Sequence, residues 1–110
     1  MTNDEFVEKR FVRRLHEMGI YDEVVRLIRP RGVPVEALVS RARHKHVSAA
    51  RHEIMYWIRM KMKWSFPAIG KLFNRDHTTI MSACRKIYLE NPTFGGAIPD
   101  PYDVSEWLIR

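Results

Sequence analysis

Apolar residues recur every three to four positions along most of the chain, which is the spacing of one buried face of an α-helix. In the first part of the chain this apolar face consists of Val7, Phe11, Leu15 and Met18. Thr2 and Glu5 have the spacing of a capping box, and Gly19 follows the last apolar residue as a stop signal. The pattern therefore predicts a helix that begins near Thr2 and ends before Gly19.

Two shorter helical segments are predicted next. The first covers residues 22–28 and ends at the Arg-Pro-Arg-Gly turn of residues 29–32, where proline and glycine both oppose a helix. The second follows Pro34, and its apolar face consists of Val35, Leu38, Val39 and Ala42. Residues 43–47 are basic and weakly periodic, so we expect a loop there.

A longer helix and a short one are predicted after this loop. The longer helix covers residues 48–62 and buries a stripe that consists of Ala50, Ile54, Trp57, Ile58 and Met62. The short helix covers residues 66–73, with Ser65 as its N-cap and Pro67 in its first turn. Asn74 follows it, and asparagine tolerates the left-handed backbone with which many helices end.

A last long helix is predicted over residues 77–90, before the Asn-Pro pair that closes it. Its apolar face consists of Ile80, Ala83, Cys84 and Ile87. No segment has a convincing strand pattern. The expected fold is therefore all-α, a compact domain of about five to six helices.

The 110 residues suffice for one domain. We divide them into an N-terminal helical extension (1–20), a central helical domain (21–90) and an acidic tail rich in proline and glycine (91–110). In the tail, a helical turn near residues 103–109 would dock Trp107 and Leu108.

Basic charge is concentrated in the middle of the chain. Nineteen basic and thirteen acidic residues give a net charge of +6. Residues 1–40 are neutral, residues 41–88 carry the basic excess, and residues 89–110 are acidic. A basic centre of this kind is typical of proteins that bind nucleic acids. A single cysteine favours a reducing cytoplasm, and no apolar run is long enough for a membrane span, so we expect no membrane partner.

The predicted helices over 66–73 and 77–90 have the dimensions of a helix-turn-helix, in which the second helix enters the major groove of duplex DNA. Polar side chains suited to bases and phosphates begin that second helix: Arg75, Asp76, His77, Thr78 and Thr79. A carboxylate accepts from a cytosine amino group, a histidine donates to a base acceptor, and a threonine methyl meets a thymine methyl. Many all-α proteins contain two such helices, so the shape alone is a weak signal.

The stretch SFPAIGKLFNRDHTTIMSACRKI (65–87) resembles the C-terminal DNA-binding domain of the bacterial replication initiator DnaA, whose signature is RDHTT followed by ACRKI. Upstream, VPVEALVSRARHKHV is similar to the family's short helix and basic loop, and ARHEIMYWIR is similar to the long helix that follows. The resemblance covers about residues 22–88. It implies a module that reads a short, asymmetric duplex site, the DnaA box, as a monomer through the major and minor grooves.

The resemblance also implies a DNA-binding role for individual residues. Arg43 matches an arginine that enters the minor groove, and Pro67 matches a proline that packs near a thymine methyl. Three further basic residues match positions near phosphates: Lys45, Arg51 and Arg59. The family's major-groove readers match Asp76, His77, Thr78 and Thr79. The complete set of candidate DNA-binding residues is Arg41, Arg43, Lys45, Arg51, Arg59, Pro67, Arg75, Asp76, His77, Thr78 and Thr79.

The chain departs from the family's pattern at several positions. Ala49 and Ala50 stand where the family often has Arg-Pro, His52 replaces a common glutamine, and Asn74 replaces a glycine. Gly70-Lys71 lacks the other glycine of a phosphate-binding loop, so we interpret this pair as surface of the short helix. We therefore expect no ATPase domain, and no ATP-driven assembly from this chain alone.

Some candidate residues have simpler interpretations. Asp76 suits an N-cap, and capping is compatible with base contact because a carboxylate has several acceptor positions. His44, His46, His52 and Cys84 suggest zinc, but Cys84 lies on an apolar helix face and the first two histidines lie in a basic loop. We expect no metal and no other cofactor. No nucleophile, base and orienting group have a catalytic spacing, so we expect no enzyme activity.

The sequence thus predicts a sequence-specific duplex-DNA-binding protein, cytoplasmic and associated with the nucleoid, in a bacterium or a phage. It would regulate transcription or replication initiation at sites like the DnaA box. The alternative is an interaction adaptor or inhibitor that keeps the fold but binds DNA weakly. Such a protein would contact a protein partner through residues 1–20 or the acidic tail.

Overall fold

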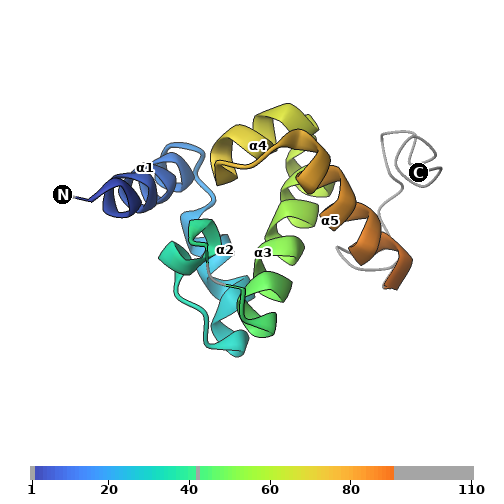
Figure 1. The fold of residues 1–110 in the computed structure, drawn as a ribbon, viewed down its shortest axis with the longest axis horizontal. Coiled ribbons are helices and arrows are strands. Elements are labelled where there is room, and N and C mark those ends of the chain that lie inside the picture. Colours follow the sequence, from blue (N-terminus) through green and yellow to red (C-terminus); the bar gives the residue numbers. More distant parts are fainter. Residues whose placement is uncertain (1, 42, 91–110) are drawn as a thin grey trace.

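A computed structural model describes residues 2–41 and 43–90, and these residues form helices and short connections with no strand (Figure 1). The elements in chain order are α1 (Asn3–Glu17), α2 (Tyr21–Ile28), η1 (Arg29–Arg31), η2 (Val35–Val39), α3 (Lys45–Trp57), η3 (Ile58–Met62), α4 (Phe66–Phe73) and α5 (His77–Glu90). The all-α prediction is confirmed. Ala42 and the predicted helical turn near Trp107 lie outside the described residues.

The predicted start of α1 and both predicted ends of α4 agree with the observed ones, because local interactions fix them. The hydroxyl of Thr2 accepts from the amide of Glu5 at 3.2 Å, so Thr2 is the N-cap of α1. The hydroxyl of Ser65 accepts from the amide of Ala68 at 3.2 Å and caps α4 in the same way. At the other end of α4, Asn74 takes the left-handed backbone with φ of 57°.

Three elements differ from the predictions. The segment after Pro34 forms the 3₁₀-helix η2, which ends at Val39 before the extended Ser40, whereas the predicted helical face reached Ala42.

Helix α3 begins at Lys45 rather than near Ser48, so the loop before it is shorter than expected. Most side chains of its first turn are exposed and only Val47 is buried, which is why the turn leaves no apolar period in the sequence. After Trp57 the helix widens into the π-helical turn η3, whereas the sequence predicted one regular helix through residue 62.

The core lies where α3 meets the other helices. Figure 1 shows α3 in the middle of the molecule, with α5 on one side, α2 on the other and α4 across its upper end. Phe11 of α1 and Phe73 of α4 are both buried, and their ring centroids are 5.2 Å apart. Helix α1 therefore shares the core with the other helices: Phe11 and Leu15 are buried in it, and α1 lies against η2, α2 and α4. Within the described part of the chain, no helix is long and apolar enough to cross a membrane.

Candidate nucleic-acid interface

A close backbone approach holds the turn between α4 and α5 against α4. The amide of Arg75 donates to the carbonyl of Gly70 at 2.8 Å. A Cβ atom at position 70 would lie 2.6 Å from the Arg75 carbonyl oxygen, so the turn requires glycine there. Gly70 is buried, which corrects its interpretation as helix surface, whereas Lys71 is exposed as expected.

Asp76 caps the start of α5. Its Oδ1 accepts from the amide of Thr78 at 2.9 Å and from the hydroxyl of Thr78 at 3.0 Å. These two hydrogen bonds hold the pKa of Asp76 below its ordinary value, because they favour the charged carboxylate. The side chain is exposed, and a carboxylate has further acceptor positions, so capping leaves room for a contact to a base.

The first turn of α5 presents its polar side chains outward. His77, Thr78 and Thr79 are exposed, and Nδ1 of His77 lies 3.2 Å from Oδ1 of Asp76. The Thr78 hydroxyl is engaged by Asp76, whereas His77 and Thr79 lie beside it on the open surface. A hollow of about 510 Å³ adjoins this turn, and its lining includes Pro67, Lys71, Asn74, Arg75, Asp76 and His77.

Arg75 joins the turn to the segment before α3. Its Nη1 donates to the carbonyl of Phe73 at 2.9 Å, and its Nη2 donates to the carbonyl of Ser40 at 2.7 Å. Burial lowers the pKa of its guanidinium. Arg75 thus lies beside the predicted base readers, but its described contacts hold two pieces of backbone together.

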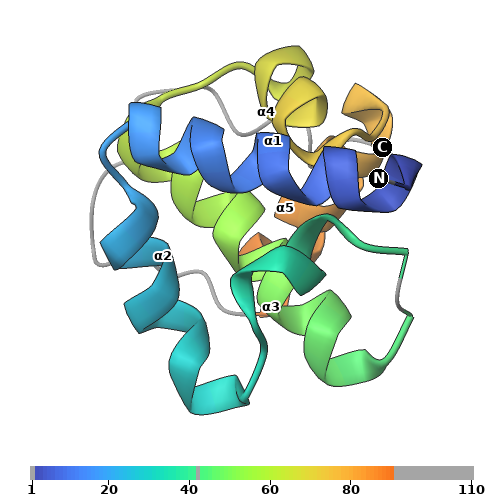
Figure 2. The same ribbon diagram turned by 90° about the vertical axis from the view of Figure 1, so that its left-hand side faces the viewer.

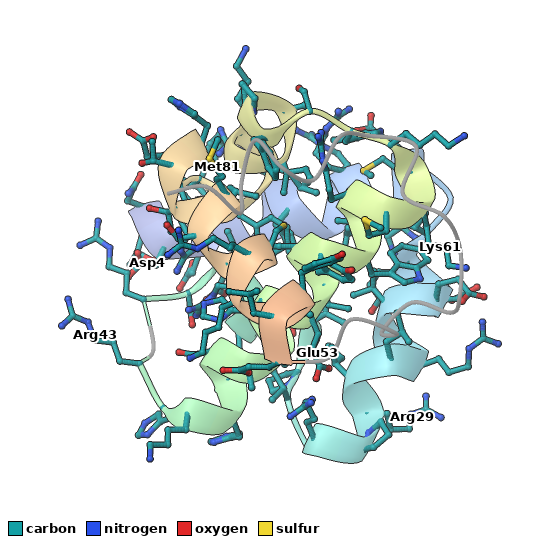
Figure 3. The ribbon with its side chains drawn as sticks, turned by 90° about the vertical axis from the view of Figure 1, so that its right-hand side faces the viewer. Asp4, Arg29, Arg43, Glu53, Lys61 and Met81 are labelled. Atoms are coloured by element: carbon teal, nitrogen blue, oxygen red, sulfur yellow. The ribbon has the colours of Figure 1, made fainter. Side chains whose placement is uncertain are left out.

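The basic loop before α3 and the first residue of α3 project cations into solvent. Arg41 and Arg43 of the loop and Lys45 of α3 are exposed, and Figure 3 shows Arg43 extending away from the ribbon. The Ser40 carbonyl at the base of this loop accepts from Arg75, so the loop starts next to the turn that precedes α5. The loop before α3 and the first turn of α5 therefore lie on one side of the molecule (Figure 2).

Arg51 and Arg59 do not belong to this surface, which corrects the expectation that they lie near phosphates. Both are only 6% exposed. Nε of Arg51 donates to the Leu38 carbonyl at 2.8 Å, and its Nη2 donates to the Ser40 carbonyl at 3.0 Å. Burial, and then the charge of nearby Arg75, lowers the pKa of Arg51 to about 10.

Arg59 is also buried and also donates to a backbone carbonyl. Its Nη1 donates to the carbonyl of Trp64 at 2.9 Å, and its guanidinium carbon lies 4.1 Å from the centroid of the Phe66 ring. Such a cation–π contact and a backbone hydrogen bond stabilise the connection from η3 to α4. The charge of Arg59 therefore helps to build the scaffold that positions α4.

The role of the Ser40 carbonyl was not predicted from the sequence, and neither was the place of Lys71 and Asn74 in the hollow beside the predicted base readers. A backbone carbonyl that accepts hydrogen bonds from two arginine side chains leaves no signal in the sequence. Lys71 and Asn74 could have been found, because they are spaced with Pro67 along one face of the short helix.

The zinc ligands considered from the sequence are not gathered into a site. Over residues 2–41 and 43–90, no group of three or more His, Cys, Asp or Glu side chains is arranged to hold a metal. The ring centroids of His44, the N-cap residue of α3, and His46, in the first turn of α3, lie 5.9 Å apart. Cys84 is buried, and burial raises the pKa of its thiol to about 12.

Comparison with known proteins identifies this arrangement. The family described as "Bacterial dnaA protein helix-turn-helix" matches residues 24–87, more than half of the chain. The chromosomal replication initiator protein DnaA of Acholeplasma laidlawii is 41% identical over 56 residues, which is 50% of this chain and 13% of the relative. The DnaA of Picosynechococcus sp. is 44% identical over 57 residues, 51% of this chain and 13% of the relative.

The DnaA of Synechocystis sp. is 46% identical over 54 residues, 48% of this chain and 12% of the relative. The chain thus spans about an eighth of the length of these curated relatives. No solved structure gave a significant match. The family match covers every helix from within α2 to α5, including the turn described above, and the chain therefore belongs to the bacterial DnaA helix-turn-helix family.

Proposed function

We propose that this chain binds duplex DNA in a sequence-specific manner, at sites like the DnaA box. The first turn of α5 enters the major groove, and the basic loop contacts the adjoining minor groove. One observation carries the proposal: the RDHTT segment of a DnaA-family match forms an exposed, capped helix start next to an exposed basic loop.

The two parts of the surface contribute differently. His77 and Thr79 present hydrogen-bonding and methyl groups on a helix that fits the major groove, so they supply sequence preference. Arg43 suits the narrow minor groove, where a guanidinium is attracted by the enhanced negative potential. Arg41 and Lys45 neutralise phosphates and supply affinity that falls steeply with salt.

The proposed biological role is the regulation of transcription or of replication initiation on the nucleoid. The curated relatives are named as chromosomal replication initiators, which favours sites near an origin. The part of each relative that this chain matches is about an eighth of its length, so an initiator's other activities are not assigned here.

The decisive experiment selects bound duplexes from a random pool and compares the enriched sequence with a DnaA box. A short asymmetric motif is the expected result. If no motif is enriched, and titration in dilute buffer detects no duplex binding, the proposal is refuted and the adaptor alternative is favoured.

A competition gel then tests the division of roles. His77→Ala or Thr79→Ala should cost about 1–3 kcal/mol on the selected site and little on random duplex. Lys45→Ala should weaken binding to both duplexes about equally. Equal losses on both duplexes for all three variants would contradict the assignment.

A further inference from the structure

The amino end of α1 lies between the two parts of the proposed interface. Figure 2 shows the start of α5, the amino end of α1 and the loop before α3 along one side of the molecule. A hollow of about 270 Å³ lies where the three meet. Its lining includes Asn3, Asp4 and Glu8 of α1, Arg41 of the loop, and Asn74 and Arg75 of the turn.

This part of α1 precedes the family match, which begins at residue 24. The hollow would otherwise be lined by cations and neutral groups, whereas α1 adds the carboxylates of Asp4 and Glu8. Figure 3 shows Asp4 at the same edge of the molecule as Arg43. The N-terminal extension thus brings negative charge to the side that the basic loop occupies.

If the chain binds DNA as proposed above, the geometry of the duplex determines which part of the DNA lies opposite these carboxylates. One phosphate backbone separates a major groove from the minor groove beside it. When α5 is in the major groove and Arg43 is in the adjoining minor groove, that backbone must pass over the surface between them. This surface is the hollow that contains Asp4 and Glu8.

We infer that the amino end of α1 is a third element of the interface, in which Asp4 and Glu8 oppose the phosphates that separate the two grooves and so limit DNA affinity. The inference rests on the proposed function. The carboxylates act on the backbone and not on base edges, so they set how tightly the chain binds and leave the preferred sequence unchanged. Their effect is electrostatic, and salt screens it.

The test removes both charges with the Asp4→Asn, Glu8→Gln double variant and measures binding to the selected duplex by fluorescence anisotropy. We expect roughly five- to tenfold tighter binding at about 50 mM salt, and less than about twofold at 0.5 M salt, because two like-charge repulsions across a hydrated surface are removed. The sequence enriched from a random pool should not change.

Two further variants make the test specific. Glu17→Gln, Asp22→Asn removes the same total charge at the opposite end of α1 and the start of α2, and it should change affinity less than about twofold at the same salt. Asn3→Asp adds a carboxylate to the hollow, suits the first turn of a helix, and should weaken binding severalfold. Thermal unfolding by circular dichroism checks that each variant is folded.

The outcomes separate the inference from the proposed function. If the wild type binds a duplex while the Asp4/Glu8 and Asn3 variants bind like the wild type, or like the charge-matched control, the role of α1 is refuted and the proposed function stands. If the wild type binds no duplex at low salt, the proposed function fails and the inference fails with it.

Discussion

Replacing Arg51 with alanine separates a scaffold role from a phosphate contact. The guanidinium of Arg51 is buried and donates to the carbonyls of Leu38 and Ser40. Alanine would remove these two hydrogen bonds and a longer one to the Ala37 carbonyl at 3.5 Å, and it would leave a void between α3 and the segment that follows η2. The basic loop, which begins after Ser40, would lose one of the attachments at its base.

The size of the effect follows from these contacts. A hydrogen bond from a charged donor is worth about 1.5–3 kcal/mol, and a buried carbonyl left without a partner is costly. Burial of the guanidinium has its own cost, which the lowered pKa of Arg51 reflects. We therefore expect Arg51→Ala to lower the free energy of unfolding by about 3 kcal/mol. Arg51→Lys should recover little of it, because an ammonium lacks the planar fork that reaches both carbonyls.

Urea denaturation followed by circular dichroism measures the loss of stability. DNA binding is then measured as a function of salt, under conditions in which each variant is folded. Arg51→Ala should keep the wild-type slope of log K against log[salt]. Lys45→Ala should reduce the steepness of that slope by about one, which is the contribution of one phosphate contact. A stable Arg51→Ala protein with a reduced salt slope would refute the scaffold role and restore the phosphate contact.

Three further experiments test the packing at Gly70, the burial of Cys84 and the effect of His52 protonation on stability. Gly70→Ala should lower the free energy of unfolding by about 1–3 kcal/mol, despite alanine's better helix propensity, because its Cβ meets the Arg75 carbonyl; urea denaturation of wild type and variant measures this. The Cys84 thiol, with its pKa raised to about 12, should react with a thiol reagent only after urea unfolds the chain, and rapid reaction of the folded protein would argue against its burial. Burial and then the charge of Lys86 lower the pKa of His52, so the unfolded chain binds a proton more readily and stability should fall as pH drops below the ordinary histidine value of about 6.5. His52→Gln should reduce that pH dependence in thermal unfolding.

The start of α1, both ends of α4 and the turn between α4 and α5 could be predicted, because the interactions that fix them join residues close in sequence. Thr2 and Ser65 cap amides three residues away, and Asn74 takes the backbone that asparagine tolerates. The first turn of α5 was recognisable because the family's signature RDHTT lies at a helix start, where the polar residues and the preceding turn are contiguous in sequence.

The sequence did not indicate that the side chains of Arg51 and Arg75 turn toward the protein interior, because the carbonyls they bind are distant in sequence. The Ser40 carbonyl lies 11 residues before Arg51 and 35 residues before Arg75. A basic residue in a basic stretch has the same sequence signature whether its guanidinium faces water or a buried carbonyl. The position of α1 against the loop and the turn likewise depends on packing between distant segments, so the charges of Asp4 and Glu8 gave no indication of what they face.

The bond between Arg75 and the Ser40 carbonyl has a consequence for target choice. This hydrogen bond joins the loop before α3 to the turn before α5, so in the proposed complex it would hold the two DNA-contacting parts at a fixed separation. Binding in one groove would then depend on binding in the other, and base substitutions in the two halves of a site should combine non-additively. A target lengthened by a single base pair between the halves should be rejected as firmly as one with either half scrambled.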